Sequence, residues 1–298
     1  MDNSVSIIVP CYNSELTIEK CALSILKNIE NTDNPNNFEL IIVNDGSNDA
    51  TKDIIKNINN AKVINHNKNQ GLSSARNSGI KKSNSEYIIF IDSDIILSDN
   101  WIKKIYYKIK ENESVVGIIG NLEPEPNKKV SSLDKYLFGA YRGTKKIDFN
   151  SPLNYKSFVF SNTIIKKNIL DQVGWFDESL VKYGGEDTEL AIRIHKIYPM
   201  GFRKIKNIHS YHITKKTVNQ HINYMFEYGQ NNFLKIIKKH PDYKNDLGYQ
   251  WIGTIKGNFL FNFFTRSICR LFLKILKHPL IIKFLVIDAF IRGAKSKI

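Results

Sequence analysis

An α/β fold built on a mainly parallel sheet is the fold class that this sequence predicts, and three observations support it. Short apolar runs alternate with helical patterns through roughly the first 200 residues, which is the rhythm of βαβ units. The run at 87–91 is continuously apolar and rich in Ile, as in a strand buried on both faces. The chain has 298 residues and is 42% hydrophobic, enough for one large α/β domain with an extension or for two small domains.

The expected elements can be placed along the chain from these patterns. The first part contains, in order, a strand at 5–9 that Pro10 stops, a helix at 15–29, a strand at 38–43, a helix at 49–58, a short strand at 62–64, a helix at 72–81 and a strand at 87–91. The second part contains a strand at 115–120, a long loop with one short helix over 123–154, a strand at 158–165, a helix at 186–197 and a strand at 203–208. Because crossovers between parallel strands are right-handed, the carboxyl ends of the first strands should meet at one edge.

Polar clusters follow three of these strands, at 10–13, 44–47 and 92–94. Open α/β sheets bind ligands at the carboxyl ends of their strands, so this edge is the predicted ligand site. Asp92 and Asp94 stand one residue apart there. Such a pair can hold a hard divalent cation through oxygen ligands and leave positions open for a phosphate-bearing substrate.

Two further segments each allow two interpretations. Asp45-Gly46-Ser47 either forms a strand-to-helix turn or presents Asp45 as an acceptor to a nucleotide base or ribose. The segment 71–77 either begins a helix that carries a surface arginine or brings Arg76 to a diphosphate.

An acidic helix start and a histidine pair follow later in the chain. Gly184 and Gly185 permit a tight turn before the acids Glu186, Asp187 and Glu189. Acids are favoured in a first helical turn by the helix dipole, but a carboxylate there can also serve as a general base toward a hydroxyl. His209 and His212 are either structural or complete the coordination of a transition-type cation such as Mn²⁺.

These motifs resemble a known family. Segments 5–13, 41–47, 71–77 and 92–94 resemble, in order and spacing, the donor half of family 2 glycosyltransferases, which have the GT-A fold. Segments 161–163 and 174–178 resemble the acceptor half, and 183–190 resembles the Gly-Gly-Glu-Asp segment of galactosyl- and N-acetylgalactosaminyltransferases. The resemblance covers about residues 4–213, so we expect a GT-A catalytic domain with a Rossmann-like mixed sheet at 1–215 and a helical extension at 216–298.

The resemblance implies a role for each matching donor-side residue. Pro10, Tyr12 and Asp45 would frame the uracil and ribose of a UDP-sugar, and Arg76 would approach the diphosphate or base. Asn44 departs from the pattern, because many relatives have a second acid at this position.

The resemblance also implies a metal and a base. Asp92 would contact the ribose or a metal-bound water, and Asp94 would bind Mn²⁺ or Mg²⁺. His212 would be the later metal ligand, with His209 as the competing candidate. Asp187 would be the catalytic base; the acceptor would contact Glu186, Trp175 and Tyr183.

The function that follows is inverting, metal-dependent transfer of a hexosyl or N-acetylhexosaminyl group from a UDP-sugar to a hydroxyl of a growing surface glycan, such as capsule or lipopolysaccharide. A single base on the attacking face implies one displacement with inversion. The alternatives are a catalytically silent glycan- or membrane-binding module and another nucleotide-sugar enzyme such as a nucleotidyltransferase. The second is disfavoured because no Gly-rich phosphate loop with a matching Lys appears near Pro10.

The basic charge gathers at the end of the chain. The formal net charge is +14, and residues 251–298 contribute +8 of it, with nine Lys/Arg against the single acid Asp288. The segment 255–277 is two-faced, apolar on one side and basic on the other. It either packs as a helix on the catalytic domain or binds an anionic membrane surface. Nucleic acid is not an expected partner, because the aromatic residues lie on the apolar face.

Location is constrained by what the sequence lacks. The N-terminus has no secretory signal pattern, and no apolar run reaches the length of a membrane span. Three cysteines without metal or redox spacing fit a reducing compartment. We expect a cytoplasmic enzyme that is peripheral on the inner face of the membrane and acts on a glycan or lipid-linked glycan, while its oligomeric state is open.

Overall fold

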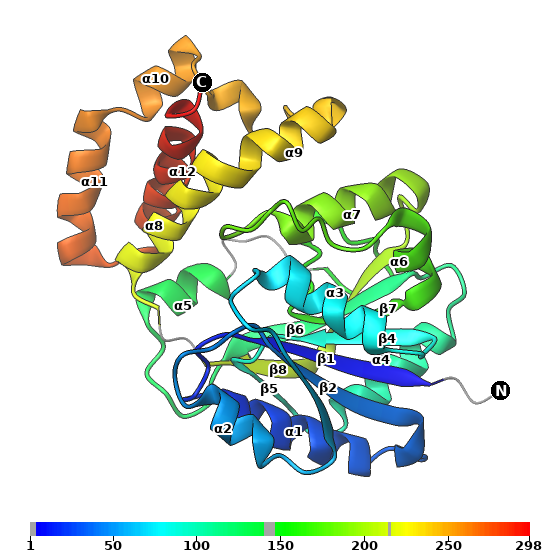
Figure 1. Ribbon diagram of the computed structural model, residues 1–298. Coiled ribbons are helices and arrows are strands. Elements are labelled where there is room, and N and C mark those ends of the chain that lie inside the picture. The colour runs from blue at the N-terminus through cyan, green and yellow to red at the C-terminus, as the bar shows by residue number, and fades with distance from the viewer. Residues whose placement is uncertain (1–3, 140–146, 214–215) are drawn as a thin grey trace. The chain divides into compact units, whose positions relative to one another are not determined.

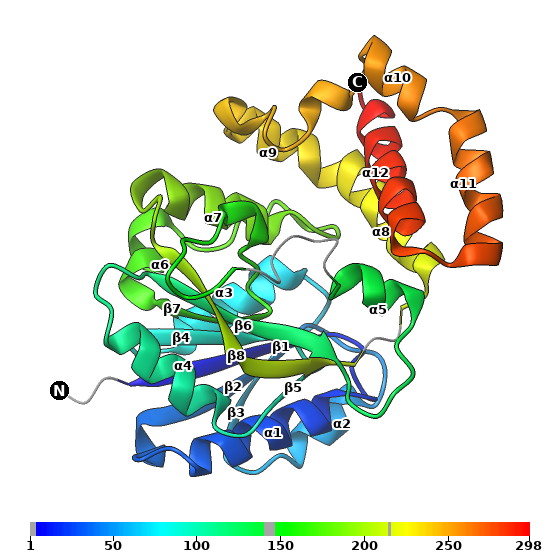
Figure 2. The same ribbon diagram turned by 180° about the vertical axis from the view of Figure 1, so that it is seen from behind.

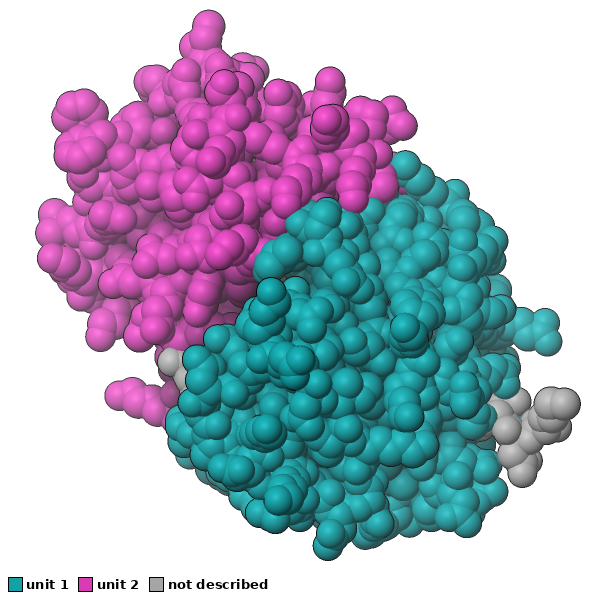
Figure 3. Space-filling model, viewed as in Figure 1, with its two compact units in different colours: residues 1–127, 146–181, 186–214 teal, residues 128–145, 182–185, 215–298 magenta. Residues whose placement is uncertain are grey.

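A computed structural model describes residues 4–139, 147–213 and 216–298 of the chain. It contains two compact units, which Figure 3 colours separately. We call residues 1–127, 146–181 and 186–214 the sheet unit, and residues 128–145, 182–185 and 215–298 the helical unit. This grouping differs from a single cut after residue 215, because two short segments inside the expected catalytic domain belong to the helical unit.

The sheet unit is built on eight strands in the order β3-β2-β1-β4-β7-β6-β8-β5. The strands are β1 Val5–Cys11, β2 Phe38–Asn44, β3 Ala61–Asn65, β4 Tyr87–Ile91, β5 Ile95–Leu97, β6 Gly117–Pro124, β7 Asn162–Lys166 and β8 Phe202–His212. The strands β1 to β4 are parallel, β7 runs against β4 and β6, and β6 pairs with β8 in parallel. The prediction of an α/β fold with a mixed, mainly parallel sheet is confirmed.

Helices cover both faces of this sheet. The helices of the sheet unit are α1 Ile18–Glu30, α2 Thr51–Lys56, α3 Leu72–Lys82, α4 Trp101–Lys110, α6 Lys167–Val173 and α7 Glu186–Ile197. Figures 1 and 2 show α1 and α2 on one side of the sheet and α3 and α7 on the other. The side chains of β1 alternate accordingly: Ile7 joins the core formed with α1 and α4, while Ile8 meets α3.

Several local expectations were wrong. The strand expected at 158–165 begins only at Asn162. The first strand does not stop at Pro10 but continues to Cys11. The ladder between β1 and β4 ends at Ile8, so Pro10 lies where its missing N–H costs no bond to β4. The long loop expected at 123–154 begins late because β6 runs to Pro124; it does contain one short helix, α5 Ser132–Leu137, and its residues 140–146 lie outside the described residues.

The helical unit consists of short helices around a central pair. Beside α5 these are α8 Val218–Tyr228, α9 Leu234–Lys239, α10 Ile255–Leu260, α11 Phe263–Leu276 and α12 Pro279–Lys295, with a π-helical segment at Gly229–Phe233. The central pair is α12 and the continuous run of α8 with the π-helical segment, and glycines allow the two to approach closely. A Cβ atom on Gly229 would lie 2.1 Å from the carbonyl oxygen of Phe290, and one on Gly293 would lie 2.1 Å from that of Phe226.

The basic segment 255–277 is two helices and not one. Phe261 and Asn262 separate α10 from α11, and the Asn262 side chain accepts a hydrogen bond from the backbone N–H of Thr265 at 3.0 Å. This capping restarts the helix, which explains why a continuous helix was the wrong expectation. Among the residues that the structure describes, no helix combines the length and apolar character that a membrane crossing requires.

Candidate active site

The predicted convergence of polar clusters at one sheet edge is observed. The strands β1, β2 and β4 are parallel, so 10–13, 44–47 and 92–94 follow the same edge. Direct bonds join them: the Asp45 N–H donates to the Cys11 carbonyl at 2.9 Å, and the hydroxyls of Ser14 and Ser93 lie 2.9 Å apart. We call this edge the rim.

Asp45 is anchored at the rim by three donors. Its carboxylate accepts hydrogen bonds from the backbone N–H groups of Gln70 at 2.9 Å and Gly71 at 2.8 Å, and His66 Nδ1 lies 2.7 Å away. The opposite ring nitrogen of His66 lies 2.9 Å from the Ser78 hydroxyl. Asp45 thus holds the loop before α3 against the end of β2. The segment 45–47 lies in the connection from β2 to α2, but α2 begins only after Ala50 and has no side-chain cap.

His66 is a residue that sequence reasoning missed. It stands in a polar loop after β3, and nothing in its immediate neighbours distinguishes it from a surface histidine. Only the pairing of β2 with β3 brings it beside Asp45. The contact of Asp45 with a nucleotide stays a prediction, as do those of the buried Pro10 and of Tyr12, whose side chain is 45% exposed just after β1.

Arg76 joins two of the predicted carboxylates. Its side chain is only 1% exposed. Nη1 donates to Asp187 Oδ1 at 2.7 Å, and Nη2 donates to Asp92 Oδ1 at 3.0 Å and to the Phe160 carbonyl at 3.4 Å. The alternative of a surface arginine is therefore wrong, and both Nη atoms are already engaged with protein oxygens. This geometry favours a positioning role for Arg76 over the expected approach to the diphosphate.

Burial and neighbouring charges shift the pKa values of Arg76, Asp92 and the adjacent Glu186. Burial alone would lower the pKa of Arg76, but the charges of Asp187 and Asp92 outweigh it and raise that pKa. Burial raises the pKa of Asp92 above its ordinary value, with the Asp94 and Asp187 charges adding to the effect and Arg76 opposing it. Burial, reinforced by the charge of Asp187, raises the pKa of Glu186 to about 7. Glu186 can therefore donate or accept a proton near neutral pH.

The two histidines of β8 have different partners. His212 Nε2 lies 3.3 Å from Asp94 Oδ2. His209 Nδ1 lies 3.2 Å from Glu123 Oε1 and 3.3 Å from the Asn121 amide nitrogen. Positions three apart on a strand face opposite sides, which explains the division. The geometry favours His212 over His209 as the partner of Asp94.

The side chains of Asp94 and His212 together fit a divalent cation. A carboxylate oxygen and an imidazole nitrogen suit Mn²⁺, and carboxylate oxygens suit Mg²⁺. Within 4–139, 147–213 and 216–298, however, no group of three or more His, Cys, Asp or Glu side chains could by itself hold a metal ion. Asp94 and His212 would therefore need ligands from a bound diphosphate or from water, as is common for Mg²⁺.

The acidic helix start lies directly after the predicted tight turn. Gly184 and Gly185 adopt φ values of +81° and +97°, which residues other than glycine rarely adopt. A Cβ atom on Gly185 would also meet Ile236 and Tyr228 at 2.7 Å. The turn delivers Asp187 into the first turn of α7, where its Oδ2 accepts from the Phe160 N–H at 3.2 Å.

The two aromatic residues expected at the acceptor have other neighbours. Trp175 donates its indole N–H to Asp171 at 2.9 Å, and its carbonyl accepts from Arg193 at 2.6 Å. Tyr183 belongs to the helical unit, where its ring stacks on Tyr224 with centroids 4.6 Å apart. Only three residues separate Tyr183 from Asp187 in sequence, so an acceptor contact for Tyr183 stays a prediction.

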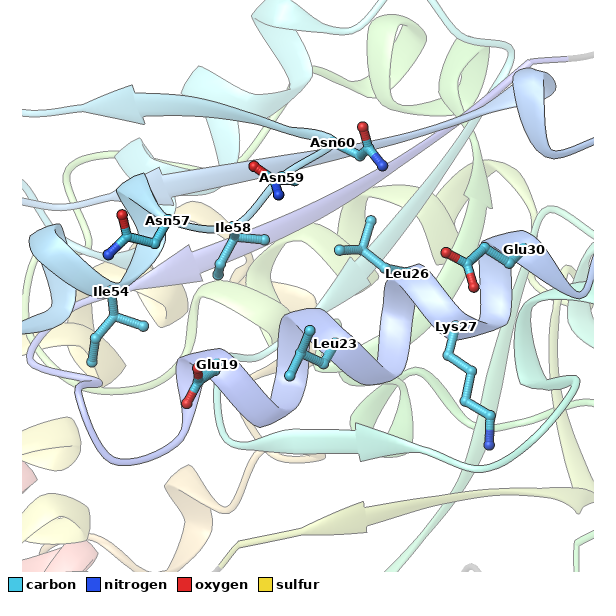
Figure 4. A pocket seen from close by; sticks show the side chains of 10 residues that line it. All are labelled: Glu19, Leu23, Leu26, Lys27, Glu30, Ile54, Asn57, Ile58, Asn59 and Asn60. Atoms are coloured by element: carbon cyan, nitrogen blue, oxygen red, sulfur yellow. The ribbon is translucent and has the colours of Figure 1, made fainter.

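The groove shown in Figure 4 is not part of this site. It lies between α1 and the end of α2, and it is lined by Glu19, Leu23, Leu26, Lys27, Glu30, Ile54, Asn57, Ile58, Asn59 and Asn60. None of these side chains is among the rim residues described above. The rim therefore remains the candidate active site, with Arg76, His212 and the carboxylates of Asp92, Asp94 and Asp187.

Comparison with known proteins identifies the class to which this sheet and its rim belong. Residues 6–174 match Glycosyl transferase family 2, which is more than half of the chain. The chain therefore belongs to glycosyl transferase family 2, and the expected family resemblance is confirmed.

Named curated relatives match parts of the chain. The poly-β-1,6-N-acetyl-D-glucosamine synthase of Staphylococcus epidermidis is 28% identical over 201 residues, covering 64% of this chain and 45% of that protein. The glycosyltransferase GlyA of Streptococcus pneumoniae is 33% identical over 121 residues, covering 40% of this chain and 17% of that protein. The chain thus spans less than half the length of these curated relatives.

Solved structures of S. aureus TarS share the fold. The 1–349 fragment in complex with UDP-GlcNAc has a TM-score of 0.56 and 18% identity, covering 98% of this chain and 91% of that chain. The complex of the same fragment with UDP has a TM-score of 0.57 and 19% identity, covering 98% of this chain and 90% of that chain. At such identity the likeness supports the GT-A fold.

Proposed function

We propose that this chain transfers a sugar from a UDP-sugar to a hydroxyl of a glycan acceptor, with inversion at the anomeric carbon. The observation that carries the proposal is the rim itself. Arg76 ties Asp92 to Asp187 with bonds of 3.0 and 2.7 Å, while Asp94 lies 3.3 Å from His212. The candidate site for charge neutralisation, Asp94 with His212, thus lies two residues along the chain from Asp92, which shares a network with the candidate base at the edge where such sheets bind ligands.

The proposed donor is supported by relatives. TarS structures contain UDP and UDP-GlcNAc, and a curated relative is named as a synthase of poly-N-acetylglucosamine. These names favour a UDP-linked N-acetylhexosamine, with a UDP-hexose as the next candidate. Pro10, Tyr12 and Asp45 would frame the uracil and ribose.

Residues at the start of α7 would handle the proton of the acceptor hydroxyl. Asp187 accepts the proton of the acceptor hydroxyl as the hydroxyl oxygen bonds to the anomeric carbon. The bond from that carbon to the diphosphate oxygen breaks, and UDP leaves with the electron pair. Glu186, whose pKa is raised to about 7 by burial, can donate a hydrogen bond to the acceptor from its protonated form. Arg76 holds the Asp187 carboxylate in place.

Mn²⁺ or Mg²⁺ would be held by Asp94 and His212. When bound, such an ion neutralises the charge that develops on the leaving diphosphate. Asp92, two residues before Asp94, would contact the ribose or a water bound to the ion.

The acceptor and the place of action complete the proposal. A named role in polysaccharide synthesis for one relative supports a growing surface glycan as acceptor. The net charge of +8 in residues 251–298 supports work at an anionic membrane, peripheral on its inner face.

The test is a screen of UDP-sugars for UDP release with Mn²⁺, with Mg²⁺ and with a chelator. We expect release from at least one UDP-sugar, faster with acceptor than without, and none with the chelator. Binding of UDP without turnover of any donor would indicate a silent module. Pyrophosphate formation from UTP and a sugar phosphate would indicate a nucleotidyltransferase.

A further inference from the structure

The helix α11 exposes an apolar face to solvent. None of its residues is buried. Seven of its large apolar side chains are 48% to 76% exposed, and these are Phe263, Phe264, Ile268, Leu271, Phe272, Ile275 and Leu276. The preceding helix α10 adds Ile255 at 89%, Phe259 at 78% and Leu260 at 41%. Contiguous apolar surface of this kind marks an interaction site in a soluble chain.

A different face of α11 attaches it to the unit. Cys269 and Leu273 pack against the core formed with α12, and Arg266 is partly covered. At about 100° per residue, this stripe lies roughly 160° from the one through Phe264, Ile268, Leu271 and Ile275. The helix therefore packs by its narrower, more polar side. Figure 1 shows α11 in orange alongside α12 in red.

A buried carboxylate fixes this orientation. Asp288 of α12 is 0% exposed, and its oxygens lie 3.2 and 3.3 Å from Arg266 Nη1 of α11. Arg292 Nε donates to the same carboxylate at 3.0 Å. Rotation of α11 that turned its apolar face inward would separate Arg266 from Asp288 and leave a buried charge poorly compensated. The outward apolar face is therefore held in place.

Basic residues border the exposed face. Arg270, Lys274 and Lys277 are exposed along one flank of α11, and Lys256 is exposed on α10. Asp288, the one acid of residues 251–298, is buried, so the surface of this region is cationic. An apolar stripe with a cationic border matches the acyl chains and headgroups of an anionic bilayer.

We propose that α10 and α11 form a docking surface for an anionic lipid bilayer, with α11 lying in the plane of the interface. The 14 residues of α11 are about 21 Å long at 1.5 Å per residue, too short to span a bilayer. A second copy of the chain is a less suitable occupant, because a symmetric pairing of this face would bring the same cationic flanks together. The inference rests on the proposed function only for its purpose, since lipid binding can be measured without turnover.

The experiment is sedimentation of the full chain with phosphatidylcholine vesicles, with and without phosphatidylglycerol. We expect the protein to pellet with the anionic vesicles at low salt and not with the neutral ones. The variant Phe264→Ser/Ile268→Ser/Leu271→Ser should remain in the supernatant. The matched control Leu16→Ser/Leu23→Ser/Met200→Ser removes exposed apolar side chains elsewhere and should pellet like the wild type.

A second pair of variants separates charge from apolar contact. Arg270→Glu/Lys274→Glu should weaken vesicle binding at least ~25-fold, since each basic residue near an anionic surface strengthens binding roughly fivefold. Lys52→Glu/Lys56→Glu makes the same change in charge, with the same spacing, on the exposed face of α2 and should bind like the wild type.

Three results would overturn the proposal. One is wild-type protein that stays in the supernatant with anionic vesicles. Another is equal binding by both serine variants when circular dichroism shows both folded. The third is a wild-type oligomer in lipid-free solution that the α11 serine variant alone dissociates, because the face would then be an interface between copies. UDP release on a soluble acceptor, measured in parallel, reports separately on the proposed enzyme activity.

Discussion

The sheet unit and the helical unit depart from ordinary protein surfaces in opposite ways. At the rim of the sheet unit, the charged groups of Arg76, Asp92 and Asp187 are drawn into a shared, largely buried network. In the helical unit, apolar side chains are left in solvent along α11 while the carboxylate of Asp288 is buried. Buried charge is costly unless it is paired, and exposed apolar surface is costly unless something covers it. Each departure therefore marks where a ligand is expected: a nucleotide sugar at the rim and a bilayer at α11.

The largest effect should follow from changing the candidate base. Asp187→Asn should lower kcat by ~10²–10⁴, the usual contribution of a general base, while UDP affinity stays near that of the wild type. Asp53→Asn, an exposed carboxylate on α2, is the control and should leave kcat unchanged. Kinetics of UDP release measure both. Turnover close to wild type in Asp187→Asn would move the base elsewhere, with Glu186 as the next candidate.

In the helical unit the largest effect should be on stability. Asp288→Ala leaves Arg266 and Arg292 without their buried partner, so we expect a loss of about 3–5 kcal/mol in unfolding free energy. Asp99→Ala breaks the exposed pair with Lys27 and should cost about 0–1 kcal/mol. Urea unfolding monitored by circular dichroism compares them. Equal losses would mean that the Asp288 cluster does not fix α11.

A smaller, pH-dependent effect is expected from Glu186. Because burial raises its pKa from 4.5 to about 7, the folded state keeps a proton that the unfolded state releases. The stability that this proton contributes is fully present below about pH 4.5 and is lost as pH rises through 7. Glu186→Gln mimics the protonated form, so above pH 7 it should be about 1–3 kcal/mol more stable than the wild type.

Thermal melts across this pH range provide the measurement for Glu186. The control Glu111→Gln, an exposed residue after α4, should follow the wild-type curve. A parallel pH profile for Glu186→Gln and wild type would show that Glu186 does not titrate in this window.

The smallest of these effects concerns His66 as a positioning residue. His66→Ala removes a buried partner of Asp45, so we expect KM for the donor to rise about tenfold with little change in kcat. His66→Asn keeps a donor close to the position of Nδ1 and should restore part of the affinity. His278→Ala, a histidine of the helical unit, is the control. A fall in kcat with unchanged KM would argue that His66 does not support donor binding.

The sequence predicted the rim because strand periodicity and the positions of strand ends place the polar clusters together. It could not predict the burial of Arg76, because that depends on carboxylates 16 and 111 residues farther along the chain. His66 was missed for the same reason, since only strand pairing brings it to Asp45.

The tail shows a different limit of sequence reasoning. Helical periodicity separated the apolar face from the basic face correctly, but it does not tell which face packs. The choice is made by Cys269 and Leu273 on α11 and by the pairing of Arg266 with Asp288, which are contacts across helices. The break at Asn262 was visible as an Asn followed three residues later by Thr, a capping pattern that the continuous amphipathic stripe obscured.

The central claim is that donor binding and its metal dependence belong to the rim, through Asp94 beside His212. Calorimetry of UDP binding to the wild type and to Asp94→Ala, with and without Mn²⁺, tests it most directly. The account predicts that Mn²⁺ strengthens UDP binding to the wild type at least ~10-fold and leaves the variant unaffected, because a ligand of the ion has been removed. Equal enhancement by Mn²⁺ in both proteins would contradict the assignment of Asp94 and, with it, the proposed site.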